Sequence, residues 1–220
     1  MTRAVPLFRW FASTSVMAAV LFLCAGRTDV PMMKTYLVIF AGLGLVTSLA
    51  IDSTLDGERR KPGPVEINPT SRVAASLLFL VTLTAAALDR GRFNWTPKMT
   101  ETMQIAALIV LVMAAALEVW ALVANPFFST AIRIQADRGH RLVTRGPYRF
   151  VRHPGYLAMT MIIPATALAL GSLASLIPAL SYSALILHRT VSEDRFLTER
   201  LRGYAGYAQA VRYRLIPGLW

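Results

Sequence analysis

Side chains that could bind a charged ligand are concentrated in the last third of the chain. Two of the three histidines, His140 and His153, lie in a basic stretch between residues 125 and 155. An arginine, Arg189, and a carboxylate, Glu193, follow further along. Oppositely charged groups of this kind suit a ligand that is itself zwitterionic, because each end can form a charge-assisted hydrogen bond.

The sequence Arg152-His153-Pro154-Gly155-Tyr156 is typical of the start of a helix. Proline suits the first helical turn, where its missing N–H is not needed. A helix start presents unpaired N–H groups and a partial positive charge, so this segment predicts a site for a carboxylate or phosphate. The alternative is a positive anchor at a helix end that binds no ligand.

Arg189 and Glu193 are four residues apart and therefore share one face of a helix. In one interpretation they form an ion pair on a solvated surface. In the other, each holds a different part of a ligand, and the sequence alone leaves both open.

A metal centre is not expected. His140 and His153 are 13 residues apart, which is not a two-ligand helix spacing, and few carboxylates lie near them. The turn signal Gly146-Pro147 instead folds the His140 segment back toward the predicted helix start. The single cysteine, Cys24, lies in an apolar run and excludes an internal disulfide.

The elements that must position these residues are apolar helices. Only 16% of the 220 residues are charged and the mean hydropathy is +0.50, whereas a soluble domain carries about 25% charged residues. We predict an all-α, polytopic membrane bundle with about six transmembrane helices, the last two forming a short hairpin around Gly171-Ser172. The six apolar segments are residues 7–25, 33–51, 73–88, 103–124, 156–170 and 173–187.

The distribution of basic residues predicts the orientation. If all six segments cross, 18 of the 23 Lys and Arg residues lie on the side of the two termini, and the other side holds Arg27, Lys34, Arg90, Arg92 and Lys98. The positive-inside rule then places both termini in the cytoplasm, which is the inner (cell) membrane arrangement if the source is bacterial. The net charge of +11 is explained by this rule and by anionic lipid, and no nucleic-acid partner is expected.

The predicted organisation is an N-terminal transmembrane scaffold of four helices, residues 1–124, and a C-terminal catalytic module, residues 125–220. Gly42 and Gly44 lack the strand and third glycine of a dinucleotide site, so we interpret them as small residues that let two helices approach. The polar stretch 52–71 is predicted to be a connecting loop. Glu118 lies inside the fourth apolar segment, where an ionisable group tends to face the bundle interior, and its role stays open.

Several short motifs in the last third occur together and in order. They are Leu-Val-Thr-x-Gly-x-Tyr at 142–148, Arg-His-Pro-x-Tyr at 152–156, an apolar hairpin, Arg-x-x-x-Glu-Asp at 189–194, and Gly-Tyr-x-x-Tyr with a basic tail at 203–217. This ordered set resembles the isoprenylcysteine carboxyl methyltransferase family of integral membrane enzymes, over roughly residues 125–220. The family often has a second glutamate where this chain has Asp194.

The resemblance implies a methyltransferase that uses S-adenosyl-L-methionine and holds it in a cytoplasmic pocket. A lipid-facing opening would admit the methyl acceptor, which would be lipophilic or a small molecule, and Arg189 would contact that acceptor. The residues implied for the cofactor site are His140, Leu142, Val143, Tyr148, His153, Pro154, Gly155, Tyr156 and Glu193.

Other functions remain open at this point. Membrane enzymes that methylate a small thiol or a phospholipid amine look similar in this region, and the sequence does not separate them from enzymes that methylate the carboxylate of a prenylated cysteine. Two alternatives remain: a nicotinamide-dependent enzyme similar to membrane sterol reductases, which resemble this C-terminal module but have longer chains, and a non-enzymatic scaffold or transporter. Pro164 and Pro178 interrupt the last two apolar segments, but no matching halves of the kind found in transporters are present.

Overall fold

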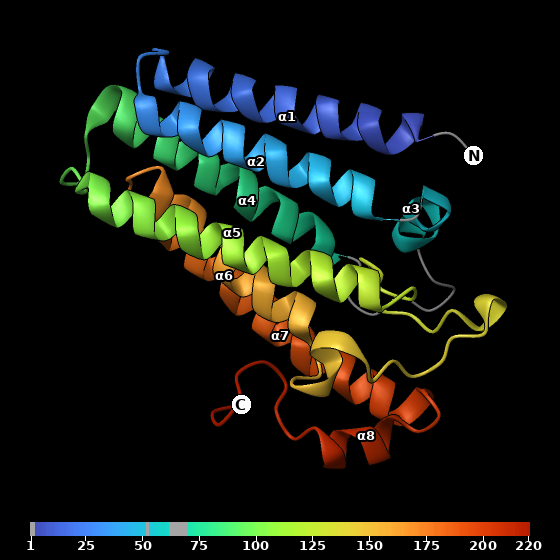
Figure 1. The fold of residues 1–220 in the computed structure, drawn as a ribbon. Helices are drawn as coiled ribbons and strands as arrows, with labels where there is room; N and C mark the ends of the chain where they lie inside the picture. Colours follow the sequence, from blue (N-terminus) through green and yellow to red (C-terminus); the bar gives the residue numbers. More distant parts are fainter. Residues whose placement is uncertain (1–2, 52, 62–69) are drawn as a thin grey trace.

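The fold is described from a computed structural model that covers residues 3–51, 53–61 and 70–220. Within these residues the chain is helical and contains no β-strand. Figure 1 shows long antiparallel helices, with α3, the loop after α5 and α8 gathered at one end of the bundle. The helices are α1 (Ala4–Ala25), α2 (Pro31–Ala50), α3 (Ser53–Arg60), α4 (Thr70–Leu88), α5 (Glu101–Ala124), α6 (Pro154–Ala169), α7 (Leu176–Arg200) and α8 (Tyr204–Ala210).

Each of the six predicted apolar segments forms a helix. Four of these helices are long and apolar enough to cross a bilayer: α1, α2, α5, and α4 together with the π-helical turn η1 (Asp89–Phe93) that extends it. Helix α6 has 16 residues, fewer than the roughly 20 that a crossing needs. The all-helical membrane fold is therefore confirmed, and the count of six spans stays a prediction.

The local sequence explains where the helices begin and end. Pro31 and Pro154 occupy the first turns of α2 and α6, as the missing proline N–H allows. The side chain of Thr100 accepts a hydrogen bond from the Met103 N–H at the start of α5. Gly171 has a φ of +79° and turns the chain between α6 and α7, which confirms the predicted hairpin.

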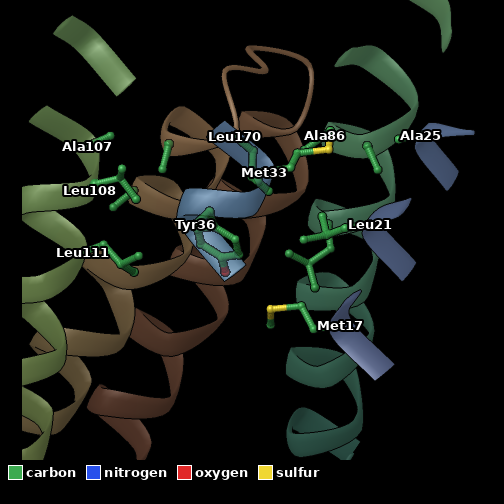
Figure 2. Close-up of a cluster of buried hydrophobic side chains, with 14 residues drawn as sticks. Met17, Leu21, Ala25, Met33, Tyr36, Ala86, Ala107, Leu108, Leu111 and Leu170 are labelled. Atoms are coloured by element: carbon green, nitrogen blue, oxygen red, sulfur yellow. The ribbon is translucent and has the colours of Figure 1, made fainter. Parts of the chain in front are cut away.

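The hydrophobic core occupies only one half of the bundle, the half away from α3 and α8. Figure 2 shows this core, in which Leu21 from α1, Tyr36 from α2 and Leu111 from α5 meet side chains of α4 and α6. Several of its members are alanines, which let helices pack closely. The buried members are Met17, Leu21, Ala25, Met33, Tyr36, Leu83, Ala86, Ala87, Ala107, Leu108, Leu111, Ala165, Ala169 and Leu170.

A buried carboxylate fixes the α6–α7 hairpin at that packed end. Asp89 is fully buried and accepts hydrogen bonds from Ser172 Oγ at 2.6 Å, Thr96 Oγ1 at 2.5 Å and Arg90 Nη2 at 2.8 Å. Because a buried carboxylate is costly unless it is hydrogen-bonded, this cluster ties the turn after α6 to the end of α4.

The structure corrects three details of the prediction. The stretch 52–71 is not only a loop, because it contains helix α3 at Ser53–Arg60; residues 52 and 62–69 of that stretch lie outside the described residues. The helix predicted to carry Arg189 and Glu193 is not separate from the last apolar segment but continues it as α7, because no Gly or Pro interrupts residues 179–200. Finally, only Gly44 packs closely: a Cβ there would lie 2.9 Å from Trp10, whereas one at Gly42 would meet nothing within 4 Å.

Candidate functional site

A cavity of about 640 Å³ lies at the end of the bundle that carries α3 and α8. Its walls come from α4, α6, α7, α8 and the loop 125–143. Eight of the nine predicted cofactor residues line it, together with Arg189; they are His140, Leu142, Val143, Tyr148, His153, Gly155, Tyr156 and Glu193. Pro154, the first residue of helix α6, does not line the cavity.

Arg189 is buried in this cavity, with only 5% of its surface exposed. Its guanidinium donates hydrogen bonds to Ser71 Oγ and, at 2.8 Å, to the carbonyl oxygen of Thr130. In the part of the chain that the structure describes, Arg189 and Glu193 form no ion pair within 4 Å. The interpretation of this spacing as an ion pair on a solvated helix face is therefore wrong.

Glu193 is held by a tyrosine from the neighbouring helix. The Tyr156 hydroxyl, on α6, donates a hydrogen bond of 2.5 Å to Glu193 Oε2 on α7. Both residues line the cavity. A carboxylate oriented in this way can receive an ammonium group of a ligand with its other lone pairs.

Asp194, the next residue, lies behind the lining and connects several residues that line the cavity. It is 6% exposed and accepts hydrogen bonds from Arg152 Nε at 2.8 Å, Arg152 Nη2 at 2.9 Å, Arg214 Nε at 2.8 Å and the Tyr204 hydroxyl at 2.9 Å. His153 Nε2 lies 3.1 Å from the same carboxylate. Burial alone would raise the pKa of Asp194, but these donors hold it well below its ordinary value. No role was predicted for Asp194, which was singled out only because the family often has glutamate at this position.

This network changes the predicted anion site. Arg152 faces Asp194, and its Nη1 also donates to the carbonyl oxygens of Val211 and Arg212 at 2.9 and 2.8 Å, so its charge is already compensated. The N–H groups of Arg152 and His153 are also used, by the carbonyl oxygens of Tyr213 and Arg214.

The groups at this helix start that remain for an anion belong to the next two residues. Among the described residues, no hydrogen bond satisfies the main-chain N–H groups of Gly155 and Tyr156, in the first turn of α6. Such groups attract anions because they combine free donors with the positive end of the helix dipole. A side chain at position 155 would collide with Phe128, since a Cβ there would lie 2.4 Å from that ring.

His140 contributes to the lining from the loop between α5 and α6. Its ring stacks on Phe127 with 4.6 Å between centroids, and its Nδ1 accepts a hydrogen bond from the Gln135 N–H at 3.3 Å. Burial, with Arg133 and Arg138 nearby, lowers the pKa of His140 to about 4. The ring is therefore neutral at physiological pH and offers an apolar surface rather than a charge.

Tyrosines and apolar side chains complete the cavity. The Tyr207 hydroxyl on α8 donates to the carbonyl oxygen of Tyr148 at 2.6 Å, and Asn125 Nδ2 donates to the Tyr148 hydroxyl at 3.3 Å. Leu142 packs in a small cluster with Leu201 and Tyr204, which joins the loop to α8. The helical form of residues 204–210 was not predicted, although Gly203, with a φ of +85°, marks its start.

The N-terminal half also contributes to the cavity. Residues of α3 and α4 line it, namely Arg60, Arg72, Val73, Ala75, Ser76 and Leu77. This half was predicted to be scaffold, and it contains none of the motifs. Helix α4 reaches the cavity because Arg189, on α7, donates a hydrogen bond to Ser71 on α4 and fixes the two helices together.

Part of the chain matches the model of a known protein family. Residues 107–199 match the model of the isoprenylcysteine carboxyl methyltransferase (ICMT) family. This segment is an ICMT-family domain. The resemblance predicted from the motifs is thereby confirmed, and with the four apolar helices the match supports an integral membrane protein of the methyltransferase kind. A search of curated proteins finds no match to the chain.

The ICMT-family segment covers the α5–α7 side of the cavity but not all of it. The match includes Arg189 and the eight predicted cofactor residues that line the cavity. The α3 and α4 wall precedes the match, and Leu201, Tyr204 and Tyr207 follow it.

Proposed function

We propose that this protein is an S-adenosyl-L-methionine-dependent membrane methyltransferase that acts on a lipophilic acceptor. The observation that carries the proposal is one cavity that gathers an oriented carboxylate, two unpaired main-chain N–H groups and a buried arginine. The ICMT-family segment that forms most of this cavity supports the same reaction.

The groups around the cavity fit the proposed cofactor. About 640 Å³ lies within the roughly 300–1,000 Å³ typical of small-molecule sites. Glu193 would receive the ammonium group of the methionyl part, and the N–H groups of Gly155 and Tyr156 would receive its carboxylate. Phe127, His140 and Leu142 offer a flat apolar surface for the adenine ring.

Bound S-adenosyl-L-methionine would supply an electrophilic methyl group on a positively charged sulfur. The protein's own task is then to align the acceptor and to exclude water. The aromatic faces of Tyr148, Tyr204 and Tyr207 stabilise positive charge without attacking the methyl group. Burial raises the pKa of each of these phenols, so they stay neutral.

Arg189 would hold the acceptor. Its guanidinium is fixed by Ser71 and Thr130 at the side of the cavity formed by α4. On that side Val73 and Leu77 line the cavity and are 62% and 56% exposed, so an apolar acceptor chain could lie along α4. A carboxylate acceptor held bidentately by arginine needs no general base, because it is already ionised.

The test is methyl transfer from labelled S-adenosyl-L-methionine. The purified protein is incubated with the labelled cofactor and a membrane extract, and the labelled product is identified. We expect label in an extractable lipophilic product, and no label with Arg189→Ala. The matched control is Arg195→Ala, since Arg195 lies on the exposed face of the same helix. Label in a water-soluble thiol would replace the acceptor class, and no cofactor binding at all would remove the proposal.

A further inference from the structure

A second cavity of about 610 Å³ lies in the half of the bundle that carries α3. It is bounded by α1, α2, α5 and α6, and by Arg60 of α3. Its polar lining includes Arg9, Ser13, Thr47, Ser48, Arg60 and Glu118. None of these residues has a part in the proposed reaction. Arg60 lines both cavities.

Glu118 is the unusual member of this lining. It lies on α5, six residues before the end of the helix at Ala124, so it is about 9 Å below that end. Across the described residues, no hydrogen bond or ion pair reaches its carboxyl group, although neighbouring polar side chains are satisfied: Thr47 and Ser48 bond to carbonyls of their own helix. A carboxyl group at this depth is costly unless a partner compensates it.

The charged side chains of the cavity suit a zwitterionic ligand. One carboxyl group, Glu118, and two guanidinium groups, Arg9 and Arg60, belong to the same lining. The apolar part of the lining includes Phe40, Leu111, Ala115 and Ile162, which suits hydrocarbon. The cavity ends where the packed core begins, since Leu111 belongs to both. Arg60, at the end of α3, places one edge of the cavity at the end of the bundle that carries α3.

We infer that this cavity binds an aminophospholipid. Glu118 receives the primary ammonium group of the headgroup, and Arg9 and Arg60 contact its phosphate. Guanidinium groups bind phosphate well even when they have other partners, because each has five N–H donors. The site is separate from methyl transfer and would place a specific lipid beside the catalytic cavity.

The cavity contains its own reporter. Trp10 lines it, and the indole N–H is fixed by a 2.7 Å hydrogen bond to the carbonyl of Ala41. A protein that keeps only this tryptophan, with Trp95, Trp120 and Trp220 changed to Phe, is reconstituted in phosphatidylcholine vesicles. A fraction of the lipid is replaced by a bromine-labelled lipid, which quenches nearby indole fluorescence. We expect brominated phosphatidylethanolamine to quench Trp10 at a concentration about tenfold lower than brominated phosphatidylcholine or phosphatidylglycerol.

Two matched variants test the origin of that preference. A protein that keeps only Trp120, which is 46% exposed, reports on surrounding lipid and should show no preference. Glu118→Gln in the Trp10 protein keeps the shape and removes the charge, so the preference should disappear, whereas Glu101→Gln at the other end of α5 should keep it. Equal quenching by all three lipids, or an unchanged preference in Glu118→Gln, would overturn the proposal. No cofactor is present, so the result is independent of the proposed reaction.

Discussion

The carboxylate of Asp194 joins two arginines that lie 62 residues apart in sequence, Arg152 before α6 and Arg214 in the tail. Arg152 donates to both carboxylate oxygens, at 2.8 and 2.9 Å, and Arg214 donates to Oδ2 at 2.8 Å. Tyr204 also donates to Oδ1, and His153 Nε2 lies 3.1 Å from the same oxygen. The tail and the start of α6 therefore depend on a single side chain of α7.

We expect Asp194→Asn to destabilise the protein by about 3–5 kcal/mol, because it leaves the charge of buried Arg152 without its partner. Asp194→Glu, which restores the residue often found in the family, should recover most of the loss. Thermal unfolding in detergent measures both. Glu199→Gln is the control, since Glu199 is exposed on the same helix, and an equal loss in this control would contradict the assignment.

The stability of the protein should also depend on pH through Asp194. Its pKa is lowered in the folded state, so its contribution is complete above the unfolded value of about 3.9 and is lost as the pH falls toward the folded value. Between pH 7 and pH 5 this contribution should be constant. Below about pH 4 the difference in stability between the wild-type protein and Asp194→Asn should shrink, and a difference that grows there would contradict the direction of the shift.

The proposed cofactor contacts predict weaker binding in two variants. Glu193→Ala removes the group assigned to the ammonium, and His153→Ala removes a wall of the cavity that is bonded to Asp194 and Tyr204. For Glu193→Ala, the lost charge-assisted hydrogen bond corresponds to about 1.5–3 kcal/mol, or roughly ten- to hundredfold in affinity. Calorimetry with S-adenosyl-L-methionine measures the change. Unchanged affinity in both folded variants would remove them from the site.

Arg189 separates acceptor binding from cofactor binding. We expect Arg189→Ala to abolish methyl transfer while cofactor affinity stays nearly intact. Arg189→Lys keeps the charge but loses the planar fork that holds a carboxylate bidentately. A carboxylate acceptor should therefore be methylated poorly by the Lys variant, whereas a thiol acceptor should tolerate it. Equal loss of cofactor binding in Arg189→Ala would move this residue to the donor side of the cavity.

The orientation in the membrane is tested with reporter fusions. The charge distribution predicts that both termini are cytoplasmic. A reporter after Trp220 should be active in the cytoplasm, and one between Asp89 and Lys98 should be active outside. A tail reporter that is active only outside would reverse the orientation and would put the cavity on the other face of the membrane.

Local patterns in the sequence were sufficient for the six long helices and for part of the cavity lining, but not for α3 and α8. Hydropathy located six helices, and the segment from Leu142 to Tyr156 carries enough motif to indicate a site. The tertiary partners were not predictable. Nothing local signals that Arg189 bonds to Ser71, 118 residues earlier, or that Asp194 meets Arg214. The charge of Arg152 was interpreted as free for a ligand because its partner is 42 residues away.

The tail contacts have a consequence for biosynthesis. The N–H groups of Arg152 and His153 bond to the carbonyls of Tyr213 and Arg214, and Tyr204 and Tyr207 close the cavity. These residues follow helices α1 to α7 in the chain and are therefore synthesised after them. A nascent chain can therefore insert and pack its core around Tyr36 and Leu111 while the cavity is still unfinished. The proposed active site is then completed on a membrane part that is already in place.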